Sequence, residues 1–353
     1  MTSTSRIPQH LAPYINNVPN DSLILLTNTL SNSTNWLVVR YLCGALSNDA
    51  SNLGRSLSQV ESGNPTAADA QDRQDVGVIL VSWMRDFDFW KAETRRTGGL
   101  DLASLSQKKK FIYIDGLSSS MPTVSTSPAT QIRDTHVLKQ PFPSVRTTLP
   151  ARGPPPPVQT PVQAASATQS TLPATKLAIN LPSTDLKNVR AAIESAIASL
   201  NTSSTLLILD APDMILALRS STSCASSSSL SSALQSMILS LRLNSRVHAT
   251  VLNLSSDVVP LPSARPEQHI PSQLETDSQA FLVGMAHSAD LVISARGLDT
   301  GAAGDVGGVL RVTKGGAYED ENEGFKEWKE QELLYLVKTD GSAKVWERSA
   351  GVG

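Results

Sequence analysis

The chain has little cysteine. Cys43 and Cys224 are its only two, too few for a disulfide framework or a cluster of metal-binding thiols. Its five histidines are scattered without the spacing of metal ligands, and no Gly-x-Ser-x-Gly nucleophile turn is present. We therefore expect neither a metal site nor a hydrolase site built on such a turn.

Long apolar runs are also missing. No stretch approaches the roughly 20 residues of a membrane-spanning helix, and the first residues lack the basic, apolar and small-residue regions of a secretory signal. We expect a protein that makes no membrane contact and is located in the cytoplasm, with the nucleus as a second candidate compartment.

Charge of neither sign dominates. The 30 Lys and Arg residues against 32 Asp and Glu residues give a formal net charge of −2. This balance excludes an electrostatic preference of the whole molecule for nucleic acid or anionic lipid, so any such contact has to be local. The 353 residues, 40% of them hydrophobic, are enough for one large domain or two ordinary ones.

Short apolar runs predict the strands of a mainly parallel sheet. Most are continuous rather than alternating, which is typical of strands buried on both faces. Segments with helical spacing of apolar residues separate them, and two C-terminal runs joined by a turn at Asp340-Gly341 predict antiparallel strands. The predicted parallel strands are 23–26, 76–82, 111–115, 206–210, 247–254 and 291–294; helices include 36–46, 185–200 and 230–241; antiparallel strands are 308–313, 333–338 and 343–348. The fold class predicted is α/β, with helices flanking the sheet and antiparallel strands at its C-terminal edge.

Residues 119–175 interrupt this pattern. They are rich in Ser, Thr, Pro and Ala, with consecutive prolines from Pro154 to Pro157. Such a composition buries too little apolar surface to offset the entropy of ordering, so we predict a disordered insertion. Neither flank has enough strands to form a covered sheet alone, and we therefore predict a single domain over residues 1–353 with this insertion inside it. A second polar stretch, 48–75, predicts a loop.

The segment 23–46 has the form of a phosphate-binding loop without its charge. In a working loop, glycines let backbone N–H groups surround the phosphates, a lysine neutralises them, and a Ser or Thr holds Mg²⁺. Counting from Thr27, Asn32 stands in place of the second glycine, Ser33 in place of the lysine, and Thr34 keeps the hydroxyl. No Lys or Arg occurs between Arg6 and Arg40. An ordinary strand–turn–helix unit, whose Asn, Ser and Thr cap the helix, is the alternative interpretation.

The run 206–210 has the form of a Walker B strand. It ends in Asp210, the carboxylate that would orient Mg²⁺ through water in a nucleotide hydrolase. The run 111–115 has the same form and ends in Asp115, so the pattern by itself has low specificity. Thr34 and Asp210 together could hold a metal ion. Without the lysine, however, the negative charge of the phosphates would be poorly compensated.

Three segments together resemble one family. The first joins Leu-Ile-Leu-Leu-Thr to Ser-Thr-Asn-Trp-Leu within 23–37. The second, at 78–96, reads Val-Ile-Leu-Val-Ser-Trp-Met-Arg-Asp-Phe-Asp-Phe-Trp-Lys-Ala-Glu-Thr-Arg-Arg, with Phe-Ile-Tyr-Ile-Asp-Gly-Leu-Ser after it, and is the most specific. The third is Gly-Val-Leu-Arg-Val-Thr-Lys-Gly-Gly at 308–316. Apart from the insertion, the chain resembles the fungal Elongator protein 6 family.

This resemblance implies a RecA-like fold, the fold of P-loop NTPases, with degenerate Walker motifs. It also implies a ring of six subunits, two each of Elongator proteins 4, 5 and 6. Such a ring binds tRNA and assists the catalytic Elongator subunits in making 5-carboxymethyluridine-type side chains on the wobble uridine. The chain would then be an accessory subunit rather than an enzyme, without a cofactor of its own.

The resemblance also implies where RNA would bind. In such folds the loops after the Walker B strand and after the next strand face the ring interior, which here are 219–229 and 255–272. Arg219, Arg265 and His269 are therefore candidate RNA contacts, although basic loop residues are often simply solvated. The other function class left open is a nucleotide-hydrolysing RecA-like ATPase, or a recombinase-related protein, with a site shared between subunits; Thr34 and Asp210 support it.

Overall fold

The computed structural model describes nine segments of the chain: 7–16, 18–30, 32–47, 75–118, 178–220, 230–257, 272–298, 303–319 and 328–348. Residues 1–121 and 176–353 form one compact unit, to which all of these segments belong. The predicted insertion 119–175 and nearly all of the predicted loop 48–75 lie outside the described residues, as do Arg265 and His269.

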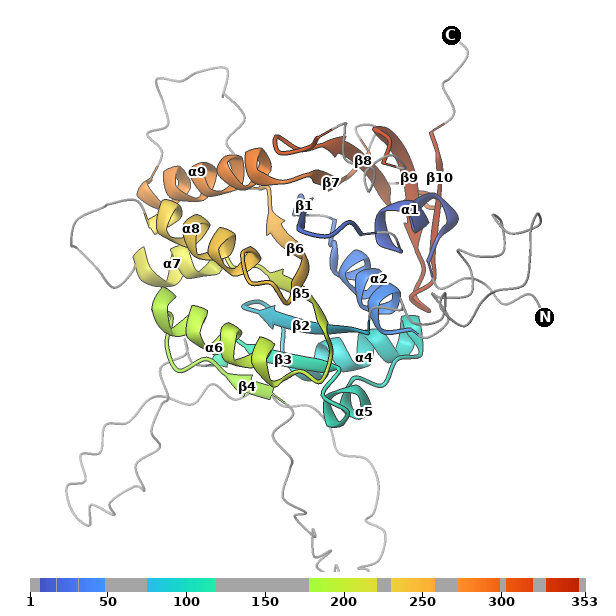
Figure 1. Cartoon of the computed structure of the whole chain (residues 1–353). Coiled ribbons are helices and arrows are strands. Elements are labelled where there is room, and N and C mark those ends of the chain that lie inside the picture. The colour runs from blue at the N-terminus through green and yellow to red at the C-terminus, as the bar shows by residue number, and fades with distance from the viewer. Residues whose placement is uncertain are drawn as a thin grey trace, which may run out of the picture. The chain divides into compact units, whose positions relative to one another are not determined.

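Strands from both flanks of the insertion form one sheet (Figure 1), in the order β10-β9-β8-β7-β1-β6-β5-β2-β3-β4. Neighbouring strands from β7 to β4 are parallel, and β8, β9 and β10 extend the other side of β7 in antiparallel pairs. The strands are β1 Ser22–Asn28, β2 Val76–Ser82, β3 Phe111–Asp115, β4 Ala178–Asn180, β5 Ser204–Asp210, β6 Val247–Ser255, β7 Leu291–Arg296, β8 Gly308–Lys314, β9 Gln331–Val337 and β10 Ala343–Glu347. The predicted fold class is confirmed.

Alternate residues of the central strands enter different hydrophobic layers, because successive side chains of a strand point to opposite faces. In β1, Ile24 and Leu26 join one buried cluster, whereas Leu23 and Leu25 join the other. Burial on both faces explains why the sequence shows these strands as continuous apolar runs.

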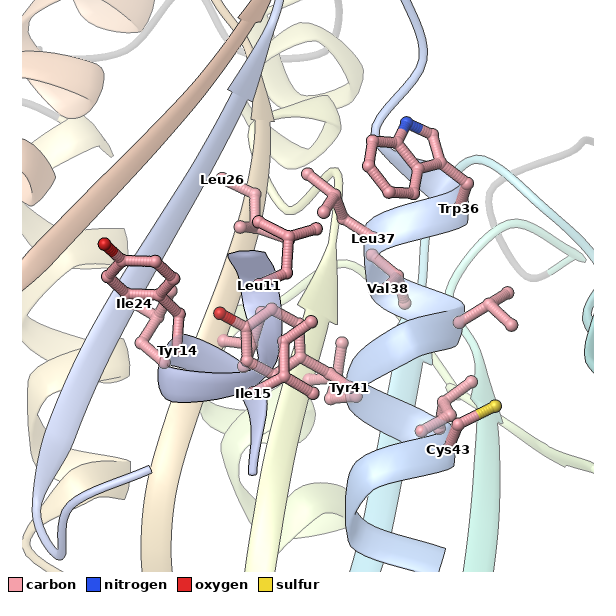
Figure 2. Packing of buried hydrophobic residues seen from close by; sticks show 14 of the residues in the cluster. Leu11, Tyr14, Ile15, Ile24, Leu26, Trp36, Leu37, Val38, Tyr41 and Cys43 are labelled. Carbon is pink, nitrogen blue, oxygen red and sulfur yellow. The ribbon is translucent and has the colours of Figure 1, made fainter. Parts of the chain in front are cut away.

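Helices cover both faces of the sheet (Figure 1). One layer contains α1, α2, α4 and α5, and the other contains α6, α7, α8 and α9. Figure 2 shows part of the first layer, where Tyr14 and Ile15 of α1 lie near Tyr41 of α2. The helices are η1 Gln9–Leu11, α1 Ala12–Ile15, α2 Asn35–Leu46, α4 Phe87–Gly98, α5 Leu102–Gln107, α6 Leu186–Ser199, α7 Met214–Ser220, α8 Leu230–Arg242 and α9 Gln273–Ser288.

Sequence patterns did not predict the short N-terminal helices η1 and α1. Their position depends on long-range contacts: the Tyr14 hydroxyl donates to the Lys329 carbonyl at 2.7 Å, and the Trp328 indole donates to the Pro13 carbonyl at 3.2 Å. Helices this short have almost no stability of their own, so packing decides them. In the described part of the chain, no helix is both long and apolar enough to cross a membrane.

Candidate functional site

The candidate site lies at the carboxyl edge of the parallel sheet, where the loop from β1 to α2 begins. Asn28, the last residue of β1, is in register with Ser255 of β6 on one side and Ala295 of β7 on the other. On the far side of β6, Asp210 of β5 is in register with Asn253. The two Walker-like elements, β1 and β5, are therefore separated by one strand, and β6 supplies the residues between them.

Four buried polar side chains from four elements are linked by hydrogen bonds; we call Thr34, Asn253, Asp210 and Ser82 the polar cluster. The Thr34 hydroxyl donates to Asn253 Oδ1 at 2.5 Å. The Asn253 amide donates to Asp210 Oδ1 at 2.7 Å, and the Ser82 hydroxyl donates to Asp210 Oδ2 at 2.6 Å. Both carboxylate oxygens thus have a donor from within the protein.

The environment of Asp210 opposes its ionisation. Burial raises the pKa of this carboxyl, while the hydrogen bonds from Ser82 and Asn253 and the charge of Arg85 lower it to a smaller extent. The Arg85 side chain is exposed and its guanidinium lies 5.0 Å from the centre of the Phe89 ring. The cluster therefore holds a desolvated carboxylate by neutral donors, with one cation acting on it from the surface.

This arrangement does not fit a magnesium–nucleotide complex. The Asn253 amide lies between the Thr34 hydroxyl and the Asp210 carboxylate, and it is bonded to both. A cation shared by Thr34 and Asp210 would have to displace that buried amide and break two short hydrogen bonds. Within the segments that the structure describes, no group of three or more His, Cys, Asp or Glu residues could hold a metal ion elsewhere.

Asn32 and Ser33, which stand in the second-glycine and lysine positions, also make hydrogen bonds within the protein. Ser33 is exposed, and its hydroxyl accepts a hydrogen bond from Asn35 N at 3.2 Å, a local contact at the start of α2. Asn32 is buried, and its Oδ1 accepts from the Tyr335 hydroxyl of β9 at 2.9 Å. The Tyr335 ring stacks on Trp36 of α2, with ring centres 5.2 Å apart. An antiparallel C-terminal strand thus fixes the loop where a nucleotide hydrolase needs glycine backbone.

The alternative of an ordinary capped turn is correct only in part. Thr34 occupies the N-cap position of α2, but its side chain makes no capping hydrogen bond. Its hydroxyl is directed to Asn253, and at 3.3 Å also to Asn28 Oδ1. Thr34 therefore belongs to the polar cluster, whereas Ser33 makes the local contact with the helix.

The other predicted residues do not join the cluster. Asp115 is used locally, since it accepts hydrogen bonds from Leu117 N, Ser118 N and the Ser118 hydroxyl. Arg219 was placed at the start of a loop, but the structure has it partly buried in the last turn of α7. The predicted loop boundary was wrong there, because the apolar residues of α7 continue the helix as far as Ser220; Arg219 as an RNA contact stays a prediction. Arg265 and His269 lie outside the described residues and stay predictions.

Asn253 and Ser82 were missed by reasoning from the sequence. Both are polar residues near the carboxyl end of a buried apolar strand, and each is paired in register with Asp210 on the neighbouring strand. A polar side chain inside a strand that is buried on both faces needs a hydrogen-bond partner. Asn253, within Val-Leu-Asn-Leu, was such a signal in the sequence.

The chain has an α/β fold with a mainly parallel sheet, in which the loop after β1 places the Thr34 hydroxyl near the terminal aspartate of β5. No protein-family model matches the chain. No curated protein matches it. Among solved structures, it is similar to a KaiC-like protein from the hyperthermophilic archaeon Pyrococcus horikoshii, with 9% identity, a TM-score of 0.46 and 97% of each chain covered. It is also similar to the flagellar accessory protein FlaH from Methanocaldococcus jannaschii, with 12% identity, a TM-score of 0.48 and 98% of each chain covered.

Proposed function

We propose that the chain is a non-catalytic RecA-like subunit of the Elongator complex. In this proposal it forms a six-membered ring with Elongator proteins 4 and 5, and the ring binds tRNA and supports wobble-uridine modification by the catalytic subunits. The family resemblance of three sequence segments supports the identity of the complex. The observation that carries the non-catalytic role is the polar cluster, in which the Asn253 amide separates Thr34 from Asp210.

The chemistry of phosphoryl transfer supports this proposal. Catalysis of that reaction depends mainly on placing positive charge around the phosphates. At the lysine position the chain has Ser33, whose hydroxyl is used by the backbone of α2. The Asn32 side chain is buried and bonded to Tyr335 rather than leaving glycine backbone exposed. The loop after β1 thus lacks the charge and the exposed glycine backbone of a phosphate-binding loop, and its Thr34 hydroxyl is bonded to Asn253.

The second candidate is a nucleotide-hydrolysing RecA-like protein with a site shared between subunits. One observation favours it: the fold brings Thr34 and Asp210 to the same place, each linked to Asn253. A neighbouring subunit would then have to supply the missing positive charge. The two candidates differ in whether any assembly that contains this chain turns over nucleotide at this site.

Purified chain should neither bind ATP–Mg²⁺ detectably in calorimetry nor hydrolyse it. Ser33→Lys should not restore turnover, because the added charge leaves the Asn253 amide between Thr34 and Asp210. The matched variant is Asp210→Asn, which keeps the shape of the side chain and, through its carbonyl oxygen, the hydrogen bond from Asn253. ATP turnover by the wild-type chain or its complex that disappears in Asp210→Asn would support the second candidate instead.

Tagged chain should co-purify with Elongator proteins 4 and 5, and the assembled ring should bind tRNA much more tightly than the isolated chain does. Its net charge of −2 gives the single subunit no strong electrostatic attraction for RNA. Repeated weak contacts around a ring raise the effective concentration of binding sites. Arg265→Glu should weaken tRNA binding without dissociating the ring, whereas Arg190→Glu on α6 serves as the control. Equal tRNA affinity of the isolated and assembled chain would contradict the proposal, as would recovery of DNA-repair proteins in place of Elongator subunits.

A further inference from the structure

The antiparallel strands β8, β9 and β10, which form one end of the sheet in Figure 1, have one face outside both hydrophobic layers. Leu333 and Tyr335 of β9 and Val345 of β10 point into the layer that contains α1 and α2. The residues between them point to the opposite side, because successive side chains of a strand alternate. On that side, helices α6 to α9 cover the parallel strands, but in the described part of the chain their layer includes no residue of β8, β9 or β10.

Strand register brings charged side chains together on this open face. Arg311 of β8 is paired in register with Glu332 of β9. Glu332 Oε1 lies 3.6 Å from the Arg296 guanidinium of β7, and Glu332 Oε2 lies 3.1 Å from the guanidinium of Arg348, the residue after β10. One carboxylate is thus surrounded by three arginines that come from different strands.

Apolar side chains lie beside these cations. Trp346 of β10 is paired in register with Leu334 of β9, and both are half-buried although neither belongs to a hydrophobic cluster. Lys344, two residues before Trp346, points to the same side and is exposed. We call this surface, which combines four cations with an indole and a leucine, the basic face: Arg296, Arg311, Leu334, Lys344, Trp346 and Arg348.

Positive charge is in excess on the basic face, although the whole chain has a net charge of −2. Glu332 is the acidic residue that the structure shows paired with this face, and two of the arginines share it. Arg311 and Lys344 are exposed, and neither forms an ion pair with a described residue. These two cations are therefore available to an anionic partner, and the contact would be local, as the overall charge balance requires.

We infer that the basic face binds single-stranded RNA, with its cations on the phosphates and Trp346 against an unpaired base. The guanidinium fork matches the geometry of phosphate oxygens. An aromatic side chain on a sheet surface can stack on a base that is not paired in a duplex. An acidic protein segment would use the cations but would leave the indole without a matching partner. The inference rests on the proposed function, in which a ring binds tRNA, and it adds a surface outside the loops that contain Arg265 and His269.

The first test removes charge in the complex assembled with Elongator proteins 4 and 5. Arg311→Gln should weaken binding of fluorescently labelled tRNA and oligouridine about fivefold, and should lower the slope of log affinity against log salt by about one, because one phosphate contact is lost. Arg311→Gln combined with Lys344→Gln should weaken binding about tenfold or more. The matched control is Lys187→Gln on α6, an exposed cation after β4 at the other end of the sheet, which should change neither quantity.

The second test separates stacking from charge. Trp346→Ala should weaken binding about fivefold or more and leave the salt slope unchanged. Trp346→Phe keeps an aromatic ring and should retain most of the affinity. Oligouridine should quench part of the tryptophan emission of the wild-type complex, and this part should be missing in Trp346→Phe. Arg311→Lys, which keeps the charge opposite Glu332, should retain the salt slope and serves as the second variant if Arg311→Gln folds poorly.

The outcomes distinguish this inference from the proposed function. Wild-type RNA affinity and salt slope in the Arg311→Gln and Lys344→Gln double variant, with an intact ring, would overturn the inference and leave the proposed function standing. Dissociation of the ring by these variants, or equal competition by polyglutamate at the same concentration of charge, would overturn it in favour of a protein partner at this face. A wild-type complex that binds neither tRNA nor oligouridine would overturn both.

Discussion

Replacement of Asp210 by alanine should destabilise the chain by about 2–4 kcal/mol, because it leaves two buried donors without an acceptor. These donors are the Ser82 hydroxyl and the Asn253 amide, both in strands that neighbour β5. Loss of the Asn253 contact should also loosen its bond with Thr34 and hence the loop after β1. Chemical denaturation of the purified chain, followed by circular dichroism, measures the change in the free energy of unfolding.

The matched replacement, Asp210→Asn, should be neutral or stabilising at pH 7. Its carbonyl oxygen can accept from Asn253, and its amide can donate to the Ser82 hydroxyl oxygen in place of the long contact from Met84 N at 3.4 Å, beside the bond from Arg85 N at 3.0 Å. The variant also removes a desolvated charge. A loss of stability in Asp210→Asn as large as that in Asp210→Ala would show that the negative charge itself holds the site together.

The difference in stability between the wild type and Asp210→Asn should depend on pH with a defined sign. Burial raises the pKa of Asp210 in the folded state above its ordinary value of 3.8. The folded state therefore binds this proton more tightly than the unfolded state, and the resulting stability is lost as the pH rises through the raised pKa. The stability of Asp210→Asn relative to the wild type should accordingly increase as the pH rises above about 4.

Replacement of Trp36 by alanine should be the most destabilising change next to the loop after β1, at about 3–5 kcal/mol. Trp36, which lies at the start of α2 in Figure 2, is buried and stacks on Tyr335. Its loss opens a cavity between α2 and the C-terminal strands and removes the contact that holds the Tyr335 ring. Thermal and urea unfolding should both show the loss, with a two-state transition at a lower midpoint.

Tyr335→Phe is the matched control for that prediction. It keeps the ring stack on Trp36 and removes only the hydroxyl that donates to Asn32 Oδ1, so a cost of about 1 kcal/mol is expected. Equal losses in Trp36→Ala and Tyr335→Phe would mean that the hydrogen bond to Asn32, rather than the aromatic packing, fixes the loop. Burial raises the pKa of Tyr335 to about 12, so its hydroxyl stays protonated and able to donate at neutral pH.

The sequence predicted an element correctly where the pattern of apolar residues directly reflects which faces of that element are buried. Runs such as Val-Ile-Leu-Val in β2 are continuous because both faces of the strand are covered, and this signal predicted the parallel strands other than the short edge strand β4. The sequence pattern did not predict α1 or α7. These short helices depend on packing against residues that are distant in the sequence. For Arg219 the boundary between helix and loop was wrong, since helix ends are poorly marked when apolar residues run up to a serine-rich segment.

By itself, the sequence determined the fold class and the absence of Lys and Arg from the loop after β1, because periodicity sets which faces are buried and because Ser33 cannot carry a charge. Only the tertiary structure decided which side chains the residues of this loop contact. It brought Asn253 and Ser82 to Asp210, and Tyr335 to Asn32. These groups lie far apart along the chain, so their meeting follows from strand order and register, which no local pattern encodes.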